Sequence, residues 1–193
     1  MVSFICAQGI GMHLIRKQVS MLSIGYGKKV SVSVSGKEVI LYTFPTPEQL
    51  AEADPIALTL CTNNNRIRAI NIILAAKGVL EGRINFDYLA NRELPLSELR
   101  NELCKNPGIG FKIADCIALF GLARFDAFPI DTHVKQYLAK WFNSTIALRS
   151  LTPVSYLALD AEARTFLNPE LAGYAGHILF HCWRSEIKKL RFF

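Results

Sequence analysis

Lys112 and Asp131 are the two residues of this sequence that could together carry out covalent chemistry. Lys112 lies in the first turn of an expected helix, where the helix dipole disfavours positive charge and so favours the neutral, nucleophilic amine. Asp131 is the expected N-cap of a later helix, whose terminus keeps a carboxylate ionised, as the partner of a cationic intermediate must be. Taken singly, a surface lysine and an ordinary helix cap explain each residue, so only the pair predicts a reaction.

The turn before Lys112, Pro-Gly-Ile-Gly, could bind an anion. Gly108 and Gly110 allow left-handed or closely approaching backbone and leave amides free at the start of the next helix. Those amides and the helix dipole favour a phosphate, although an ordinary turn between two helices can have the same composition. Cys116 follows Lys112 by one helical turn, so we expect both side chains to line one wall of a pocket.

The elements that must position these residues are mainly helices separated by Pro and Gly. Start patterns at Thr46 and Asp54, each followed by proline, predict two short helices. The other helices are expected over residues 2–24 with a break near Gly9 and Gly11, over 65–80, from near 96, 111 and 131, and over 153–166 and 169–186. In the helix from 111, apolar spacing predicts a buried stripe of Ile113, Cys116, Ile117 and Phe120.

Residues 28–44 have the only persuasive strand pattern. Apolar and polar side chains alternate there around Ser35-Gly36, as they do in a small β-hairpin. The fold is therefore expected to be mainly α, with at most one small β-hairpin.

Composition restricts the class of protein further. A chain of 193 residues can bury a real core, and no apolar run approaches the roughly 18 residues that a membrane span needs, so we expect a soluble protein with no membrane partner. The apolar N-terminus is better explained by a buried helix than by a signal peptide. Five scattered cysteines without a C-x-x-C pair predict a reduced intracellular location, in the cytoplasm or nucleoid of a prokaryote, and no metal or other cofactor. A net charge of +6 favours a polyanionic partner without identifying one.

The segment NPGIGFKIADCIALFGLARFDAFPIDTH resembles the helix-hairpin-helix and Gly/Pro-Asp motif of DNA glycosylases. The resemblance places the helix-hairpin-helix at about 95–123 and the Gly/Pro-Asp loop at about 124–133. It continues through SFICAQ, FPTPEQLA, the Arg68-Ala69 pair and AGYAGHILF, and so implies one glycosylase domain over 1–193 built of two helical lobes. The K-I-A-D-C and Phe-Pro-x-Asp-x-His runs resemble the oxoguanine branch, although Asp131-Thr132-His133 also suits the endonuclease III branch.

This resemblance implies a bifunctional glycosylase and AP lyase that acts, as a monomer, on double-stranded DNA containing a damaged base. Lys112 would attack the sugar carbon, expel the base and form a Schiff base, while Asp131 would stabilise the developing sugar cation. The base must leave the duplex to be reached, and 8-oxoguanine is the expected target. The matching DNA-binding positions are Gly108, Gly110, Cys116, His133, Arg68, Ile67 and Phe180. In the family Arg68 would reach the opposite strand, Ile67 would replace a wedge aromatic, and Phe180 would stack on the base or belong to the core.

Three positions depart from the oxoguanine pattern. Gly9 stands in place of an Asn-rich stretch that fills the vacated stack, Leu14 replaces the arginine that reads the opposite cytosine, and Gly176 replaces the glutamine that bonds the flipped base. These losses predict broader tolerance of lesion or opposite base. The chain also begins at the helix with SFICAQ, so we expect it to lack the β-rich N-terminal domain of the larger enzymes. Removal of oxidised pyrimidines, abasic-site cleavage and a non-catalytic DNA-binding module remain alternatives.

Overall fold

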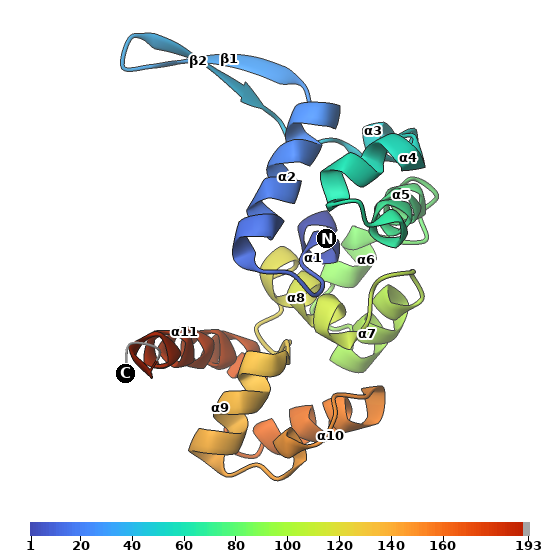
Figure 1. Cartoon of the computed structure of the whole chain (residues 1–193). Helices are drawn as coiled ribbons and strands as arrows, with labels where there is room; N and C mark the ends of the chain where they lie inside the picture. Colours follow the sequence, from blue (N-terminus) through green and yellow to red (C-terminus); the bar gives the residue numbers. More distant parts are fainter. Residues whose placement is uncertain (191–193) are drawn as a thin grey trace. The chain divides into compact units, whose positions relative to one another are not determined.

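The computed structural model describes the backbone of residues 1–190 and the side chains of residues 1–187, so the last three residues of the expected 1–193 domain lie outside it. The helices are α1 Val2–Cys6, α2 Met12–Tyr26, α3 Pro47–Ala51, α4 Pro55–Thr59, α5 Arg66–Leu80, α6 Phe86–Ala90, α7 Leu96–Cys104, α8 Phe111–Gly121, α9 Thr132–Phe142, α10 Pro153–Ala163 and α11 Ala172–Leu190 (Figure 1). Short 3-10 turns are η1 Leu60–Thr62, η2 Ile146–Leu148 and η3 Pro169–Leu171, and the strands are β1 Lys29–Val34 and β2 Lys37–Tyr42. The expected mainly α fold is confirmed, since helices make up 63% of the chain.

The chain divides into two compact units, in agreement with the two helical lobes that were predicted. Unit 1 contains Met1–Phe86 together with Lys105–Gly108, and unit 2 contains Asp87–Cys104 together with the chain from Ile109 onward. Within residues 1–190, no helix combines the length and the apolar character needed to cross a membrane.

In unit 1, helix α5 is packed against α1, α3 and α4. It begins where Asn65 accepts a hydrogen bond from the amide of Arg68 at 2.9 Å, and its residues Ala69 and Ile72 are completely buried. The predicted starts of the short helices are also confirmed. Thr46 forms a reciprocal capping box at the start of α3, and Asp54 caps α4.

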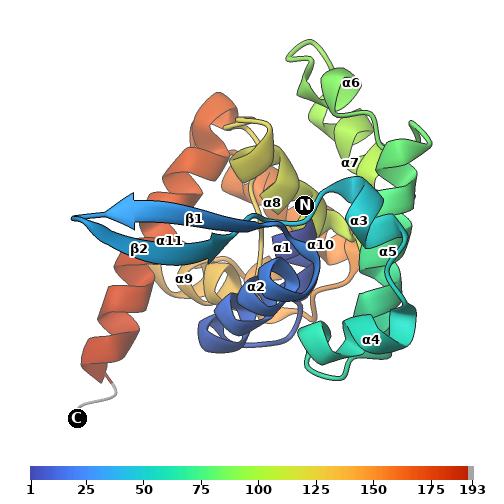
Figure 2. The ribbon, with the colours of Figure 1, turned by 90° about the horizontal axis from the view of Figure 1, so that it is seen from above.

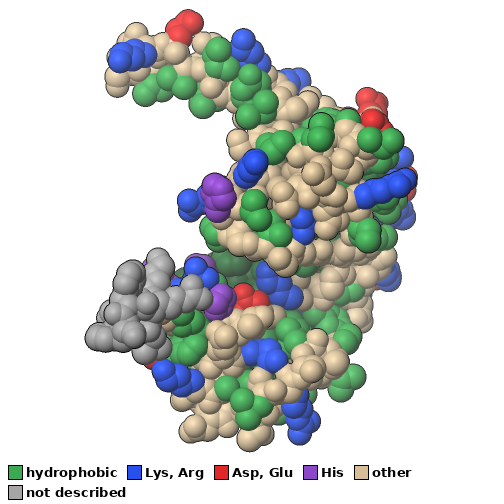
Figure 3. Space-filling model, in the orientation of Figure 1, with side chains coloured by type: hydrophobic (Ala, Val, Ile, Leu, Met, Phe, Trp, Pro, Cys, Tyr) green, Lys and Arg blue, Asp and Glu red, His purple; other side chains and the backbone are tan. Residues whose placement is uncertain are grey.

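The predicted hairpin is present, and it projects from the helices of unit 1 (Figure 1). Its turn residues Ser35 and Gly36 both have positive φ, at 50° and 78°, the backbone that suits a two-residue turn between twisted strands. All twelve strand residues are exposed, and apolar side chains, drawn green, lie along its surface (Figure 3). The alternating pattern therefore predicted the strands but not a buried face.

Unit 2 has its own core, in which α11 lies against α9 (Figure 2). Its largest fully buried side chains include Phe128, Ile130 and Tyr137. The prediction that Phe120 belongs to the buried stripe of α8 is wrong, because 52% of this residue is exposed and its ring meets the edge of His177. The core surrounds α8 on all sides from 113 to 119, and the helix leaves it at residue 120.

Candidate active site

Lys112 is the second residue of α8 and is half-buried. The helix starts at Gly110, which has extended backbone and provides no side-chain cap. The first helical hydrogen bond runs from Ala114 N to Gly110 O at 2.9 Å, and among the described residues no acceptor faces the amides of positions 111–113. Those three N–H groups and the positive end of the helix dipole are therefore free to bind an anion.

The turn before α8 requires a glycine at one of its two glycine positions. Gly108 has φ +80°, and a Cβ there would lie 2.4 Å from Nδ2 of Asn71 in the same unit. The Gln8 side chain also donates a hydrogen bond to the Gly108 carbonyl. Gly110 has ordinary extended backbone, and nothing lies within 4 Å of an added Cβ, so neither strain nor crowding requires glycine there. The lack of a side chain at Gly110 leaves the neighbouring amides open.

Lys112 and Asp131 both influence the pKa of the Cys116 thiol. Burial raises the pKa of the Cys116 thiol to about 11, against the lowering effects of the Lys112 charge and of a hydrogen bond from that amine. The charge of Asp131 raises the same pKa. That Lys112 and Cys116 line one wall of a pocket stays a prediction, and the structure places both on α8, one helical turn apart.

Asp131 is held as the N-cap of α9, as its position in the sequence predicted. Its Oδ1 accepts hydrogen bonds from the amides of His133 at 2.8 Å and Val134 at 2.9 Å. No described residue bonds to Oδ2. The carboxylate is thus fixed by one oxygen while the other remains available to a cationic partner.

His133 and Phe180 lie together on α9 and α11. Their ring centroids are 5.8 Å apart with the planes at 75°, and Phe180 is partly packed on the core of unit 2. Arg184 Nη1 lies 3.1 Å from His133 Nε2, and because arginine can only donate, Nε2 accepts and Nδ1 carries the hydrogen toward Gln136 Oε1. Whether Phe180 stacks on a base stays a prediction.

Two of the three positions that depart from the oxoguanine pattern are glycines, and the third is a half-buried leucine. A Cβ on Gly176 would lie 2.2 Å from Cε2 of Phe128, so the Phe128 ring fills the space that a longer side chain at position 176 would need. Gly9 has φ +67° and open space around it, and Leu14 is half-buried.

The structure places Arg68 inside unit 1, so its expected contact with the opposite strand stays a prediction. This residue is 6% exposed, and its guanidinium donates to the carbonyls of Gln8 at 2.5 Å and Thr62 at 3.4 Å, inside unit 1. Ile67, by contrast, is 72% exposed, and Arg66 is exposed in the first turn of α5. Arg66 is a candidate DNA contact that the sequence analysis missed. The spacing could have indicated it, because two residues that are two apart on a helix do not share a face.

Comparisons with known proteins show what the chain is similar to, although no family model matches it. The chain is 30% identical over 180 residues to the N-glycosylase/DNA lyase OGG1 of Arabidopsis thaliana, covering 93% of this chain and 48% of that protein. MBOgg1 in complex with a low-affinity DNA ligand superposes with a TM-score of 0.80 at 32% identity, over 96% of this chain and 58% of that one. The Clostridium acetobutylicum 8-oxoguanine glycosylase/lyase, bound to dsDNA containing cytosine opposite 8-oxoG, superposes with a TM-score of 0.77 at 30% identity, again over 96% and 58%. The chain spans about half the length of the Arabidopsis relative.

Proposed function

Because the chain belongs to the helix-hairpin-helix superfamily of DNA glycosylases, we propose that it is a bifunctional glycosylase and AP lyase. The proposal is supported by Lys112, half-buried at the uncapped start of α8, together with Asp131, whose Oδ2 has no partner among the described residues. A nucleophilic amine beside a fixed carboxylate suits displacement at a sugar carbon that becomes cationic. The substrate we propose is double-stranded DNA that contains an oxidised purine, and the main lesion we propose is 8-oxoguanine.

In the proposed reaction the Lys112 amine bonds to the sugar carbon that carries the damaged base. The bond to the base breaks, and its electron pair leaves with the base, which then takes up a proton. Loss of a proton from the amine and opening of the sugar give a Schiff base, from which elimination of the 3′ phosphate cleaves the strand. The free amides at the start of α8 are available to hold a DNA phosphate during these steps.

Borohydride trapping tests the nucleophile. Wild-type protein should form a covalent adduct with lesion and abasic duplexes, and Lys112→Gln should form none, because glutamine cannot make a Schiff base. A wild-type protein that gives no adduct, or a Lys112→Gln variant that still gives one, would refute the role of Lys112.

Asp131→Asn tests the carboxylate with little disturbance of the fold. Asparagine caps helices about as well as aspartate, so the hydrogen bonds to the amides of His133 and Val134 can be kept. We expect DNA binding to persist while single-turnover base excision falls by about 10²-fold or more, as when one fixed electrostatic group is removed from an active site. An unchanged excision rate would refute this role.

A second candidate is the same chemistry on another lesion, an oxidised pyrimidine or an abasic site. It is favoured by the Phe128 ring, which occupies the space beside Gly176 where a glutamine would otherwise stand. A panel of duplexes, each with one oxidised purine, oxidised pyrimidine or abasic site opposite each base, separates the two candidates. Strict preference for one lesion opposite cytosine would contradict the broader tolerance that these departures predict.

A further inference from the structure

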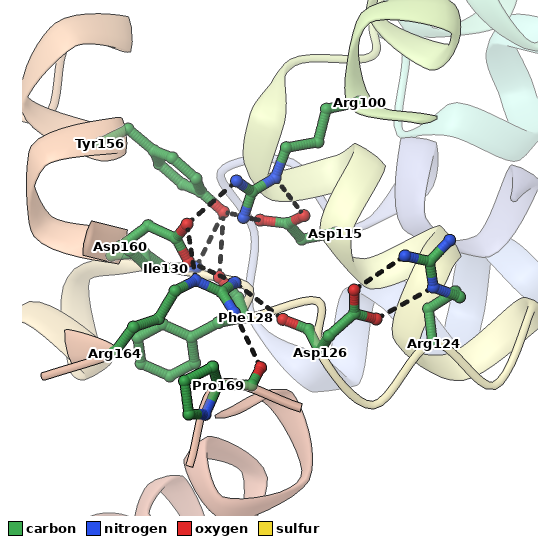
Figure 4. A network of polar contacts seen from close by, with 10 residues as sticks. All are labelled: Arg100, Asp115, Arg124, Asp126, Phe128, Ile130, Tyr156, Asp160, Arg164 and Pro169. Carbon is green, nitrogen blue, oxygen red and sulfur yellow. Dashed lines mark hydrogen bonds and ion pairs between the residues drawn. The ribbon is translucent and has the colours of Figure 1, made fainter. Parts of the chain in front are cut away.

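A buried polar network in unit 2 joins the helix that carries Lys112 to the loop that carries Asp131 (Figure 4). Its centre is Asp115, three residues after Lys112 on α8 and completely buried. Arg100 of α7 donates to this carboxylate twice, from Nε to Oδ1 at 2.8 Å and from Nη2 to Oδ2 at 2.9 Å. Two parallel hydrogen bonds of this kind fix both distance and orientation.

Tyr156 of α10 links Asp115 to the backbone next to Asp131. Its hydroxyl donates to Asp115 Oδ2 at 2.6 Å and accepts from the amide of Ile130 at 3.1 Å. Burial and the charge of Asp115 raise the pKa of Tyr156 well above its ordinary value, so the hydroxyl keeps the hydrogen that it donates. Ile130 directly precedes Asp131, so one hydroxyl ties α8 to the residue before the carboxylate.

The same loop is held at its beginning by a second part of the network. Arg100 Nη1 reaches Asp160 Oδ2 at 3.0 Å, and Asp160 in turn accepts from Arg164 at 2.9 and 3.1 Å. Arg164 Nη2 then donates to the carbonyl of Asp126 at 2.7 Å. Because the segment between α8 and α9 has no regular structure, its path depends on tertiary contacts, and these contacts at 126 and 130 are two of them.

Stability alone does not require such a network. Buried ion pairs lose much of their attraction to desolvation, and well-packed apolar side chains of similar volume are often equally stable. Arg100 illustrates the balance, since burial lowers its pKa while its hydrogen bonds and proximity to Asp115 and Asp160 raise it more. What apolar packing cannot supply is a directional bond to the amide of Ile130.

We propose that Tyr156 is a positioning residue, which sets the place of Asp131 relative to Lys112 by bonding at once to Asp115 on the lysine's own helix and to the amide of Ile130 before the aspartate. The proposal rests on the proposed function of the Lys112 and Asp131 pair. It assigns to Tyr156 no contact with DNA.

Tyr156→Phe, compared with Tyr137→Phe, tests the proposal. Tyr137 is completely buried in the same core, and its hydroxyl lies 3.5 Å from the carbonyl of Gly176, so both variants lose one buried hydroxyl but only one loses the link to the loop. Base excision is measured under single turnover, with duplex affinity and borohydride trapping on abasic DNA measured alongside. We expect Tyr156→Phe to slow excision about 10-fold or more, since small misplacements of catalytic groups are costly. Affinity and trapping should change less than about twofold, and Tyr137→Phe should excise at nearly the wild-type rate.

Four outcomes would overturn the proposal. If a folded Tyr156→Phe variant excises the base at the wild-type rate, the link is not needed. If the excision rate falls equally in Tyr156→Phe and Tyr137→Phe, the loss is a general effect of destabilisation. A wild-type protein that neither excises nor traps would remove the proposed function, and the positioning role with it. If Tyr156→Phe does not fold, hydrogen exchange of the Ile130 amide in the wild-type protein tests the same link: exchange should be slow because the amide donates to a buried hydroxyl, and fast exchange would refute the link.

Discussion

Replacing Gly176 by alanine should destabilise unit 2, although alanine is the better helix former. The added Cβ would lie 2.2 Å from Cε2 and 2.5 Å from Cδ2 of Phe128, well inside the 3.4 Å at which ordinary contacts begin. Phe128 is 1% exposed and belongs to the core, so its ring can retreat only by displacing other packed side chains.

The size of the effect follows from two opposing contributions. Alanine in place of glycine inside a helix stabilises by about 1 kcal/mol. Overpacking of a core costs about 1–3 kcal/mol, and an overlap of this depth belongs at the upper end. The net loss should be about 2 kcal/mol, which in a protein of this size lowers Tm by roughly 4–8 °C.

Tryptophan fluorescence during denaturant unfolding is the suitable measurement, because both tryptophans, Trp141 and Trp183, lie in unit 2. Gly121→Ala is the matched control within that unit. The nearest atom to its Cβ would be Ile117 Cγ2 at 4.0 Å, so this substitution should stabilise by up to about 1 kcal/mol. An unfolding midpoint for Gly176→Ala at or above wild type, or a loss that stays undiminished when Phe128 is shortened to leucine, would refute the reasoning.

Three further predictions concern burial and charge. Arg100→Met should cost about 3–5 kcal/mol in the same unfolding measurement, since it leaves buried Asp115 without a guanidinium partner and removes one of the two from Asp160, and a loss below about 1 kcal/mol would contradict this. With a maleimide at pH 8, exposed Cys182 should be modified rapidly and buried Cys116 slowly, because a thiol whose pKa is raised to about 11 is only about 0.1% thiolate at that pH. The reactivity of Cys116 should rise as the pH approaches 11. Equal modification rates of the two cysteines in the folded protein would contradict the site geometry. Arg66→Ala should weaken duplex binding and its salt dependence without loss of stability, whereas Arg68→Ala should destabilise unit 1; the reverse pattern would restore Arg68 as the DNA contact.

Features set by neighbouring residues could be predicted from the sequence. Helix starts at Thr46, Asp54 and Asp131 depend on a side chain two or three residues from the amide that it caps, and all three are present.

Features set by distant residues could not be predicted. The network around Asp115 joins residues 100, 115, 156 and 160, which no local pattern connects. One indication was available, because an aspartate within the apolar run Ile-Ala-Asp-Cys-Ile-Ala requires a buried partner. The burial of Arg68 could not be predicted for the same reason, since its partners are carbonyls at positions 8 and 62.

The loop before Asp131 is held on a second side by α11, and this restricts how a base could be read. Gly173 N donates to Phe125 O at 2.8 Å, and a Cβ on Gly173 would lie 1.8 Å from Ala127 O. Gly176 is on the same face of α11 and meets the Phe128 ring, so the helix rests on the loop through two positions without side chains. A glutamine introduced at 176 would therefore push on the segment whose path places Asp131. If the chain has the proposed function, a side chain at 176 long enough to reach a base would disturb the placement of the carboxylate, so we expect discrimination between lesions to depend on other residues.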